Sequence, residues 1–284
     1  MPKLKDIRIR DPFILTDRKN NCYYMYGTTS LEDGSIRAGN SFSVYKSYDL
    51  EDFCEPKVVF DGSTSDFWAD RDFWAPEVHE YLGRYYLFGS CKAEGRHRAT
   101  HIFVSDTPDG SFVPLTSEPL TPKEWDCLDG TLFVENGTPY MVFCHEWVQI
   151  GDGEMCALEL SEDLTRAVGE PIVLFRASDN SDVGSVPGHN AAYVTDGPFL
   201  YREDGKVKMI WSSLGLGRYL VLGAESDSIR EPWSQRGSVF DFDGGHAMLF
   251  DRLDGKRMIA LHSPNIAGLE RAAFLEYPHR KKLK

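Results

Sequence analysis

"DGTLFVENGTPYMVFCH" (residues 129–145) and "DGPFLYREDGKVKMIWSS" (residues 196–213) share one pattern. Each stretch begins with Asp-Gly, continues as an apolar run, turns at a Gly-containing loop and returns through a second apolar run. Two apolar runs joined by a short turn of this composition predict a β-hairpin. Because the same hairpin is predicted twice, a repeat architecture is the first hypothesis.

Three further hairpins of the same kind are predicted, at residues 11–28, 75–90 and 246–263. The five starts, at positions 11, 75, 129, 196 and 246, are separated by 64, 54, 67 and 50 residues. These separations leave room for two more strands after each hairpin. Apolar runs followed by Ser and Asp supply such strands in the segments that begin at Ser41, His101, Met155 and Tyr219.

Four-stranded units repeated around an axis form a β-propeller, and no apolar period of 3.6 residues persists long enough for a substantial helix. The sequence therefore predicts an all-β, five-bladed β-propeller formed by a single domain, residues 1–284. Only 38 residues follow position 246, fewer than a full unit, whereas residues 5–10 ("KDIRIR") alternate as a strand does. We expect N- and C-terminal strands to close the ring together. A β-sandwich with similar hairpins is the alternative fold.

Composition narrows the classes of partner. The formal net charge of −13 opposes binding to nucleic acid, because affinity for phosphate backbones depends on Lys and Arg. The sequence has no run of 18 apolar residues that would indicate a membrane span. No secretory signal is found, so we expect a cytoplasmic protein, with a secreted or periplasmic one as the alternative if a leader was removed. The six cysteines have neither metal-site spacing nor a C-x-x-C motif, which favours reduced, structural thiols. The oligomeric state is left open.

The acids at the hairpin starts raise the question of function. In a propeller, the start of each innermost strand and the end of the next strand lie on the same face. The starts are expected to bring together Asp11, Glu77, Asp129, Asp196 and His246, and the returns to add His145, Glu146, Trp147, Trp211 and His262. A single Asp at a strand start is usually a turn residue, but several carboxylates aimed at one axis repel one another and indicate a functional site.

Clustered carboxylates beside aromatic side chains suit hydrolysis of a glycosidic bond, in which one acid protonates the leaving oxygen and another activates water. Trp74, Trp147 and Trp211 are expected to offer apolar ring faces to a sugar, with Glu77 and His145 as polar contacts. The alternative for each Trp is packing between blades, and we expect at least one of the three to be core.

Five motifs in order resemble the blade starts of glycoside hydrolase family 43. They are "RDPFI" (residues 10–14), "WAPEV" (74–78), "DGTLF" (129–133), "TDGPFLY" (195–201) and "GGH" (244–246). The resemblance implies a five-bladed propeller that hydrolyses plant oligosaccharides with inversion, as an α-L-arabinofuranosidase ahead of a β-xylosidase. Its expected partner is an oligosaccharide substrate.

The resemblance also implies residue roles. Asp11 would be the general base on the attacking water, and Asp129 would tune the pKa and orientation of the general acid. The family normally has Glu before Gly-Pro as that acid, whereas this chain has Asp196, one methylene shorter. Glu146 is the rival acid. His246 corresponds to a central His that takes part in binding a metal ion, often calcium, which is not required for the chemistry.

Two other classes of function stay open. The first is a non-catalytic carbohydrate-binding propeller in which the acids only bind sugar hydroxyls. The second is another enzyme on the same fold, active on galactan or cleaving with phosphate instead of water. A phosphorolytic enzyme would need a basic pocket, for which the chain offers Arg37, Arg96, Arg98 and Arg218.

Overall fold

The computed structural model describes residues 1–29, 39–64 and 66–277, so Arg37 lies outside the described residues. Nineteen strands form five antiparallel sheets within this part of the chain. The first sheet comprises β1 (Arg10–Asp17), β2 (Cys22–Thr28), β3 (Ser41–Ser47) and β4 (Lys57–Asp61), and the second β5 (Arg71–Tyr81), β6 (Arg84–Lys92), β7 (Ala99–Ser105) and β8 (Val113–Pro114). The third comprises β9 (Cys127–Glu135), β10 (Thr138–His145), β11 (Glu154–Glu159) and β12 (Ile172–Arg176). The fourth comprises β13 (Asp196–Glu203), β14 (Lys206–Gly215), β15 (Arg218–Ser226) and β16 (Ser234–Ser238), and the fifth β17 (Gly245–Asp251), β18 (Arg257–Ser263) and β19 (Arg271–Glu276).

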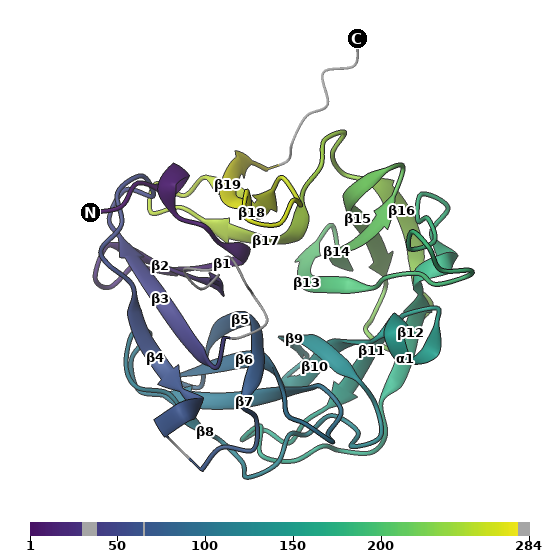
Figure 1. Cartoon of the computed structure of the whole chain (residues 1–284), viewed down its shortest axis with the longest axis horizontal. Helices are drawn as coiled ribbons and strands as arrows, with labels where there is room; N and C mark the ends of the chain where they lie inside the picture. Colours follow the sequence, from purple (N-terminus) through teal and green to yellow (C-terminus); the bar gives the residue numbers. More distant parts are fainter. Residues whose placement is uncertain (30–38, 65, 278–284) are drawn as a thin grey trace.

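The five sheets are arranged radially as blades, with the first strand of each blade nearest the centre (Figure 1). These inner strands contact one another in a ring, because β1 touches β5 and β17, β9 touches β5 and β13, and β13 touches β17. Helices are negligible: among the described residues there are one four-residue helix, α1 (Trp147–Ile150), and three short 3-10 turns. The predicted five-bladed β-propeller is confirmed, and the sandwich alternative is excluded.

The ring closes where the two ends of the chain meet. β1 packs against β17, β18 and β19, as expected for closure by N- and C-terminal strands. Residues before β1 do not add a fourth strand to the fifth sheet, because Leu4–Asp6 forms a 3-10 turn. The segment joins the seam through single contacts instead: Ile9 N–H donates to the Glu270 carbonyl at 3.4 Å, and Arg271 Nε donates to the Lys5 carbonyl at 2.8 Å.

The hydrophobic core consists of layers between neighbouring blades, where the apolar faces of adjacent sheets pack. All six cysteines are free, and five of them are buried in these layers, as the scattered Cys spacing predicted. Because a small thiol packs like an apolar side chain, these residues serve the core. No helix among the described residues is long and apolar enough to cross a membrane.

A β-bulge recurs at the start of every inner strand and determines which side chains reach the axis. The bulged residue of each blade has a positive φ of 46 to 55°, and these residues are Asp11, Ala75, Asp129, Gly197 and His246. The residue before the bulge pairs with the end of the return strand in the same blade, in the pairs Arg10↔Thr28, Trp74↔Ser90, Leu128↔Cys144, Asp196↔Ser212 and Gly245↔His262.

This register corrects one equivalence inferred from the repeats. The repeats align Asp196 with Asp11 and Asp129, but the residue that occupies the bulge in the fourth blade is Gly197. Asp196 stands one position earlier, where the first blade has Arg10. Since a shift of one residue turns a side chain to the other side of a strand, Asp196 enters the centre from a different direction than the other two acids.

Candidate active site

Three carboxylates and one imidazole meet on the propeller axis. His246 Nδ1 lies 3.2 Å from Asp11 Oδ1, 3.8 Å from Asp129 Oδ2 and 3.9 Å from Asp196 Oδ1. The four residues come from four different blades, so only the closed ring brings them together. The structure thus assembles Asp11, Asp129, Asp196 and His246 as the repeat pattern predicted.

These residues line a cavity of about 250 Å³. Its lining is Arg10, Asp11, Thr28, Trp74, Leu128, Asp129, Asp196 and His246. Three of the bulged residues contribute, and the residues that precede the bulges supply a guanidinium, an indole, a Leu side chain and a carboxyl group. The bulge therefore presents one or two residues of every blade to the cavity, and this is how a plain hairpin repeat builds a polar site.

Asp11 lies in cationic surroundings. Its Oδ2 accepts a hydrogen bond from Thr28 Oγ1 at 2.8 Å, and Arg10 Nε lies 4.0 Å from Oδ1. Burial alone would raise the pKa of Asp11, but the electrostatic attraction of His246 and Arg10 holds that pKa well below its usual range. Asp11 is consequently an ionised carboxylate that can accept a proton.

His262 contacts the backbone of Asp11 from the fifth blade. The Asp11 N–H donates to His262 Nδ1 at 3.2 Å, and His262 Nε2 lies 3.3 Å from Asn265 Oδ1. The same Nδ1 lies 3.4 Å from Asp11 Oδ1. This fully buried imidazole therefore holds the backbone of the bulge and the Asp11 side chain in place.

Asp129 lies in the opposite electrostatic environment to Asp11, because its carboxyl group faces another acid, Asp196. Burial, the Asp196 carboxylate and the more distant Asp11 raise the pKa of Asp129 well above its usual range. A hydrogen bond between the Asp129 and Asp196 carboxyl groups adds to this shift. The Gly197 N–H donates to Asp129 Oδ2 at 3.1 Å and holds that carboxyl group in place. The raised pKa favours the protonated form of Asp129 beside Asp196.

Hydrogen bonds between blades explain why Asp129 accepts from Gly197. In four blades the bulged N–H donates to a side chain at the end of the preceding return strand: Asp11 to His262, Ala75 to Thr28, Asp129 to Ser90 and His246 to Ser212. The corresponding return residue before the fourth blade is Cys144. Because a thiol is a weak acceptor, the Gly197 N–H is satisfied by the Asp129 carboxyl group instead.

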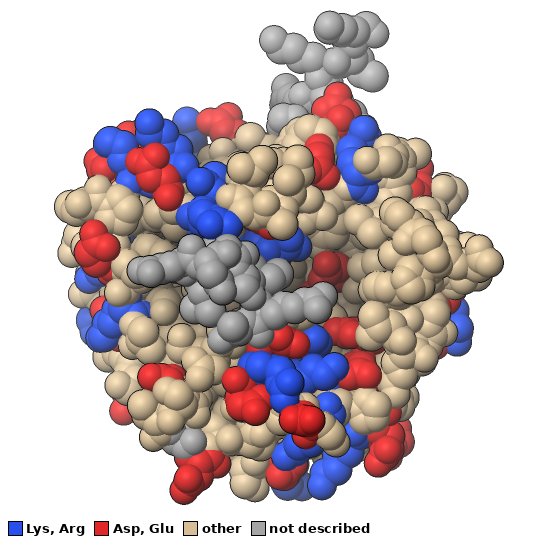
Figure 2. Space-filling view, viewed as in Figure 1, with Lys and Arg blue, Asp and Glu red and all other residues tan. Residues whose placement is uncertain are grey.

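A larger cavity of about 720 Å³ adjoins the first. The two share Trp74, Leu128 and Asp196, and the larger one is also lined by Glu146 and Trp147. Asp196 therefore stands at the junction, with 24 % of its side chain exposed, whereas Asp129 is enclosed. Figure 2 shows Asp and Glu interspersed with Lys and Arg around the centre of the face in view.

Glu146 lies in the larger cavity and not among the central carboxylates. Its Oε1 is 2.8 Å from Arg98 Nε, and Arg98 Nη2 is 3.0 Å from Asp72 Oδ2. Burial raises the pKa of Glu146 even though the Arg98 charge opposes the shift. Because Glu146 is tied to Arg98, its geometry favours a structural ion pair over proton delivery at the axis.

Two of the predicted sugar-binding aromatic residues line the cavities. Trp74 borders both, and the Arg98 guanidinium carbon lies 3.8 Å from the centroid of its ring. Trp147 borders the larger cavity, with its ring 5.2 Å from that of His189 in an edge-to-face arrangement. The positions of Trp74 and Trp147 fit the sugar-contacting role expected of them.

The sugar contact predicted for Trp211 is wrong. Its side chain is fully buried and packs against Phe175 in the core between the third and fourth blades. A ring with 0 % exposure does not contact substrate. Trp211 directly precedes Ser212, whose hydroxyl lies at the seam, and alternation along the strand turns the neighbouring indole toward the sheet face. At least one core Trp was expected, and Trp211 is that residue.

His145 and Glu77 lie outside both cavities. His145 stacks on Trp125 with ring centroids 4.1 Å apart, and its Nδ1 is 3.3 Å from Glu154 Oε2. Glu77 is buried, with Oε2 3.2 Å from His79 Nε2. Both polar side chains are satisfied inside the propeller, so the sugar contacts predicted for them are not supported by their positions.

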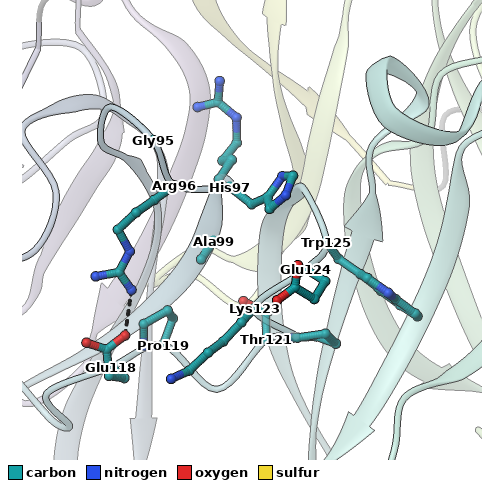
Figure 3. A pocket seen from close by; sticks show the side chains of 12 residues that line it. Gly95, Arg96, His97, Ala99, Glu118, Pro119, Thr121, Lys123, Glu124 and Trp125 are labelled. Carbon is teal, nitrogen blue, oxygen red and sulfur yellow. Dashed lines mark hydrogen bonds and ion pairs between the residues drawn. The ribbon is translucent and has the colours of Figure 1, made fainter.

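A third hollow, of about 400 Å³, lies between the loops that follow β6 and β8 (Figure 3). The charges around it are compensated, because Arg96 pairs with Glu118 at 2.5 Å and His97 Nδ1 lies 3.0 Å from Asp126 Oδ2. None of the central carboxylates lines it. Arg96 and Arg98, two of the arginines considered for a phosphate pocket, are thus both held in ion pairs.

The axis offers donors for a metal ion at Asp129, Asp196 and His246, whose ligand atoms lie within 4.8 Å of one another. His246 Nε2 is buried and has no hydrogen-bond partner among the described residues. Two carboxylates and one nitrogen fall short of the six to eight oxygen ligands that calcium prefers. These residues alone do not form a calcium cage, and calcium binding stays a prediction.

Sequence reasoning missed Arg10, Thr28, Leu128 and Tyr219, which contact the central acids or line their cavity. Arg10 and Leu128 directly precede anchor acids, so recognition of the bulge would have found them. Thr28 is the last residue of a return strand, a position already expected to face the funnel. Tyr219 comes from the third strand of a blade and carries no comparable signal.

The fold is a five-bladed propeller, and the acids on its axis lie in opposite electrostatic environments. This arrangement fits the class of enzymes that cleave glycosidic bonds with carboxyl groups. The family model described as Glycosyl hydrolases family 43 matches residues 5–279. The chain therefore belongs to this family of glycoside hydrolases.

Solved structures and curated sequences agree with this assignment. The chain is similar to the endo-arabinase from Bacteroides thetaiotaomicron VPI-5482, with 40 % identity, a TM-score of 0.89, and coverage of 99 % of this chain and 97 % of that one. A thermostable family-43 glycoside hydrolase has the same fold, with a TM-score of 0.81, 23 % identity and coverage of 97 % and 91 %.

Curated relatives are more distant. The chain is 25 % identical over 155 residues to a probable arabinan endo-1,5-alpha-L-arabinosidase C of Aspergillus clavatus, which covers 50 % of this chain and 46 % of that protein. The chain is also 23 % identical over 288 residues to an extracellular exo-alpha-(1->5)-L-arabinofuranosidase, ArbA, of Cellvibrio japonicus, with coverage of 90 % and 74 %. The first of these matches spans less than half the length of its relative.

Proposed function

We propose that the protein is an inverting glycoside hydrolase that cleaves α-L-arabinofuranosyl linkages in arabinan-type oligosaccharides. The observation that carries this proposal is the grouping of Asp11, Asp129 and Asp196 around one His246, in which Asp11 lies beside Arg10 and Asp129 lies buried beside another acid. The 40 % identity to an endo-arabinase across nearly the whole chain supports arabinose as the sugar.

Asp11 is the general base in this mechanism. Its carboxylate accepts a proton from a water molecule, which attacks the anomeric carbon of the sugar bound in the 250 Å³ cavity. The Thr28 hydroxyl donates to Oδ2 and orients the carboxylate, so that Oδ1 is the oxygen near His246 and Arg10. The surrounding positive charge keeps Asp11 ionised before each turnover.

The Asp129–Asp196 pair is the general acid. Asp129 retains the proton because it is buried beside another acid, and Asp196 stands where the two cavities join. The pair passes this proton to the glycosidic oxygen as the bond to the anomeric carbon breaks. The leaving sugar then occupies the 720 Å³ cavity, beside Trp74 and Trp147.

The size of this second cavity bears on the leaving group. A volume of about 720 Å³ next to the acid holds more than one sugar unit, which supports an oligosaccharide leaving group. A β-xylosidase is the second candidate, because a Xylosidase/arabinosidase of Bacteroides ovatus is among the relatives, at 28 % identity over 127 residues. Phosphorolysis has weaker support, since Arg96 and Arg98, two of the arginines considered for a phosphate pocket, are already paired.

Release of reducing sugar from a panel of substrates tests this proposal. The panel comprises nitrophenyl α-L-arabinofuranoside, β-xyloside and β-galactoside, with linear arabinan, xylan and galactan, each with and without inorganic phosphate. We expect cleavage of the arabinose substrates, independent of phosphate. Preferential cleavage of xylan would replace the sugar assignment, a requirement for phosphate would indicate a phosphorylase, and binding of arabinan without any cleavage would favour the carbohydrate-binding module.

A further inference from the structure

Asp196 does not stand alone at the junction of the two cavities. The Tyr219 hydroxyl donates a hydrogen bond to Asp196 Oδ2 at 2.5 Å, from a strand that begins 22 residues further along the chain. We infer that Tyr219 is a positioning residue that fixes the short Asp196 side chain for delivery of the proton to the leaving sugar. This inference rests on the proposed function, because it assigns a task within the acid step.

Tyr219 itself is held rigidly. Its side chain is buried, its N–H donates to Asp243 Oδ1 at 2.9 Å, and its ring stacks on His262 with centroids 5.5 Å apart and planes inclined by 22°. His262 in turn accepts the Asp11 N–H. The phenol therefore belongs to the same packed unit as the base, so its hydroxyl has a defined position relative to Asp11.

Gly245 makes room for the phenol ring. A Cβ on Gly245 would lie 2.2 Å from Tyr219 Cε1, closer than any real carbon contact. Gly245 occupies the position at which the other blades place Arg10, Trp74, Leu128 and Asp196. In the fifth blade this position has no side chain, and the Tyr219 ring from the neighbouring blade occupies the space.

The hydrogen bond divides the two oxygens of Asp196 between two tasks. Oδ2 is engaged by Tyr219, whereas Oδ1 lies 3.9 Å from His246 Nδ1, on the side of Asp129. The phenol is the donor of this hydrogen bond and the carboxyl oxygen is the acceptor. Oδ1 is thereby left to share the proton of Asp129 and pass it on.

This arrangement accounts for an Asp at a position where the family resemblance calls for Glu. A shorter side chain reaches less far, so its carboxyl group must be oriented more tightly to meet the glycosidic oxygen. Tyr219 supplies that orientation from outside the Asp196 side chain. A side chain that acts in this way affects the proton-transfer step and leaves substrate binding nearly unchanged.

Tyr219→Phe tests the inference, because it removes the hydroxyl and keeps the ring on His262. On arabino-oligosaccharides, whose leaving group is poor, we expect kcat to fall by about 10- to 100-fold, with KM changed by less than about threefold. On an aryl arabinoside with a low-pKa phenol, which needs little acid assistance, kcat should stay within about threefold of the native value.

Tyr201→Phe is the matched control. The Tyr201 hydroxyl lies 3.1 Å from the Tyr277 hydroxyl, near the hairpin turn at the other end of β13 from Asp196. Loss of this hydroxyl should change kcat on the oligosaccharides and on the aryl arabinoside by the same factor, since it can act only through the stability of the fold. Gly245→Ala is a second test, because displacement of the Tyr219 ring should reproduce the selective loss on oligosaccharides while the hydroxyl is still present.

The outcomes separate this inference from the proposed function. If the native protein cleaves no glycoside, the proposed function fails. If the native protein is active, and folded Tyr219→Phe keeps the native ratio of activity on oligosaccharides to activity on the aryl arabinoside, only the positioning role of Tyr219 is overturned. An equal loss on both substrates would also overturn it, because a general structural defect gives that pattern.

Discussion

Asp11 and Asp129 are the same residue type, at the same bulged position of two blades, yet their surroundings give them opposite properties. Asp11 faces Arg10 and His246, and its pKa is held low. Asp129 faces another acid in an enclosed site, and its pKa is raised well above the usual range. The comparison shows that a repeated backbone supplies the position of each acid, whereas the side chains of neighbouring blades determine its protonation state.

The residues that cross the blade seams are the origin of this difference. In the seam after the first blade, the Ala75 N–H is satisfied by the Thr28 hydroxyl, so the Asp11 oxygens stay available to Thr28, Arg10 and His246. In the seam before the fourth blade Cys144 takes the corresponding place, and the Gly197 N–H is satisfied by Asp129 itself. Asp11 is therefore held among cationic and hydroxyl groups, whereas Asp129 is held by Asp196 and the Gly197 N–H.

The largest effect is expected from Asp11→Asn, which tests the role of Asp11 as the base. This change removes the proton acceptor but keeps the shape, so hydrolysis should fall by about 100-fold or more while arabino-oligosaccharide still binds. Turnover of oligosaccharides and binding by calorimetry are the two measurements. Near-native turnover in a folded Asp11→Asn protein would place the base elsewhere.

A second test asks which residue carries the proton to the leaving group. Asp196→Asn should reduce cleavage of oligosaccharides far more than cleavage of an activated aryl glycoside, because only the poor leaving group needs an acid. Glu146→Gln, the matched variant in the adjoining cavity, should affect both substrates to the same modest extent through loss of its pairing with Arg98. The reverse pattern would make Glu146 the acid. Higher oligosaccharide activity in Asp196→Glu would show that the Asp fills the acid position imperfectly.

A third and smaller effect concerns stability and pH. A carboxyl group whose folded pKa is raised costs stability once the pH exceeds its unfolded value, and the cost grows until the pH reaches the folded pKa. Asp129→Asn removes this cost, so the variant should melt at a higher temperature than the native protein at pH 7, and the difference should shrink as the pH falls toward 4. Thermal melts of both proteins across this pH range provide the measurement. A lower melting temperature at pH 7 would show that Asp129 is ionised and favourably paired.

Much of the fold was predictable from sequence, because hairpin composition and spacing are local signals. Five pairs of apolar runs joined by polar or Gly-containing turns predicted five blades, and acids at the starts predicted a polar axis. The offset at Asp196 was not predictable in the same way, since a β-bulge shifts the register by one residue without changing the apolar pattern. Trp211 was misplaced for the same reason, as one position separates a seam residue from a core residue.

Contacts that depend on neighbouring blades were beyond the sequence. The Tyr219 hydroxyl reaches Asp196 across the sheet because Gly245, in the next blade, has no side chain. Nothing near Asp196 in the sequence indicates this partner. The pairing of Glu146 with Arg98 was hidden as well, because the two residues lie 48 positions apart and meet only where the second and third blades pack together.

The anomeric configuration of the first product tests the central claim most directly. If Asp11 activates water while the Asp129–Asp196 pair protonates the leaving oxygen, cleavage is a single displacement and the configuration is inverted. Proton NMR in the first minutes of arabino-oligosaccharide hydrolysis, before mutarotation, should therefore show the inverted anomer. Release of the retained anomer would contradict the account, because it requires a carboxylate to form a covalent bond to the sugar instead of activating water.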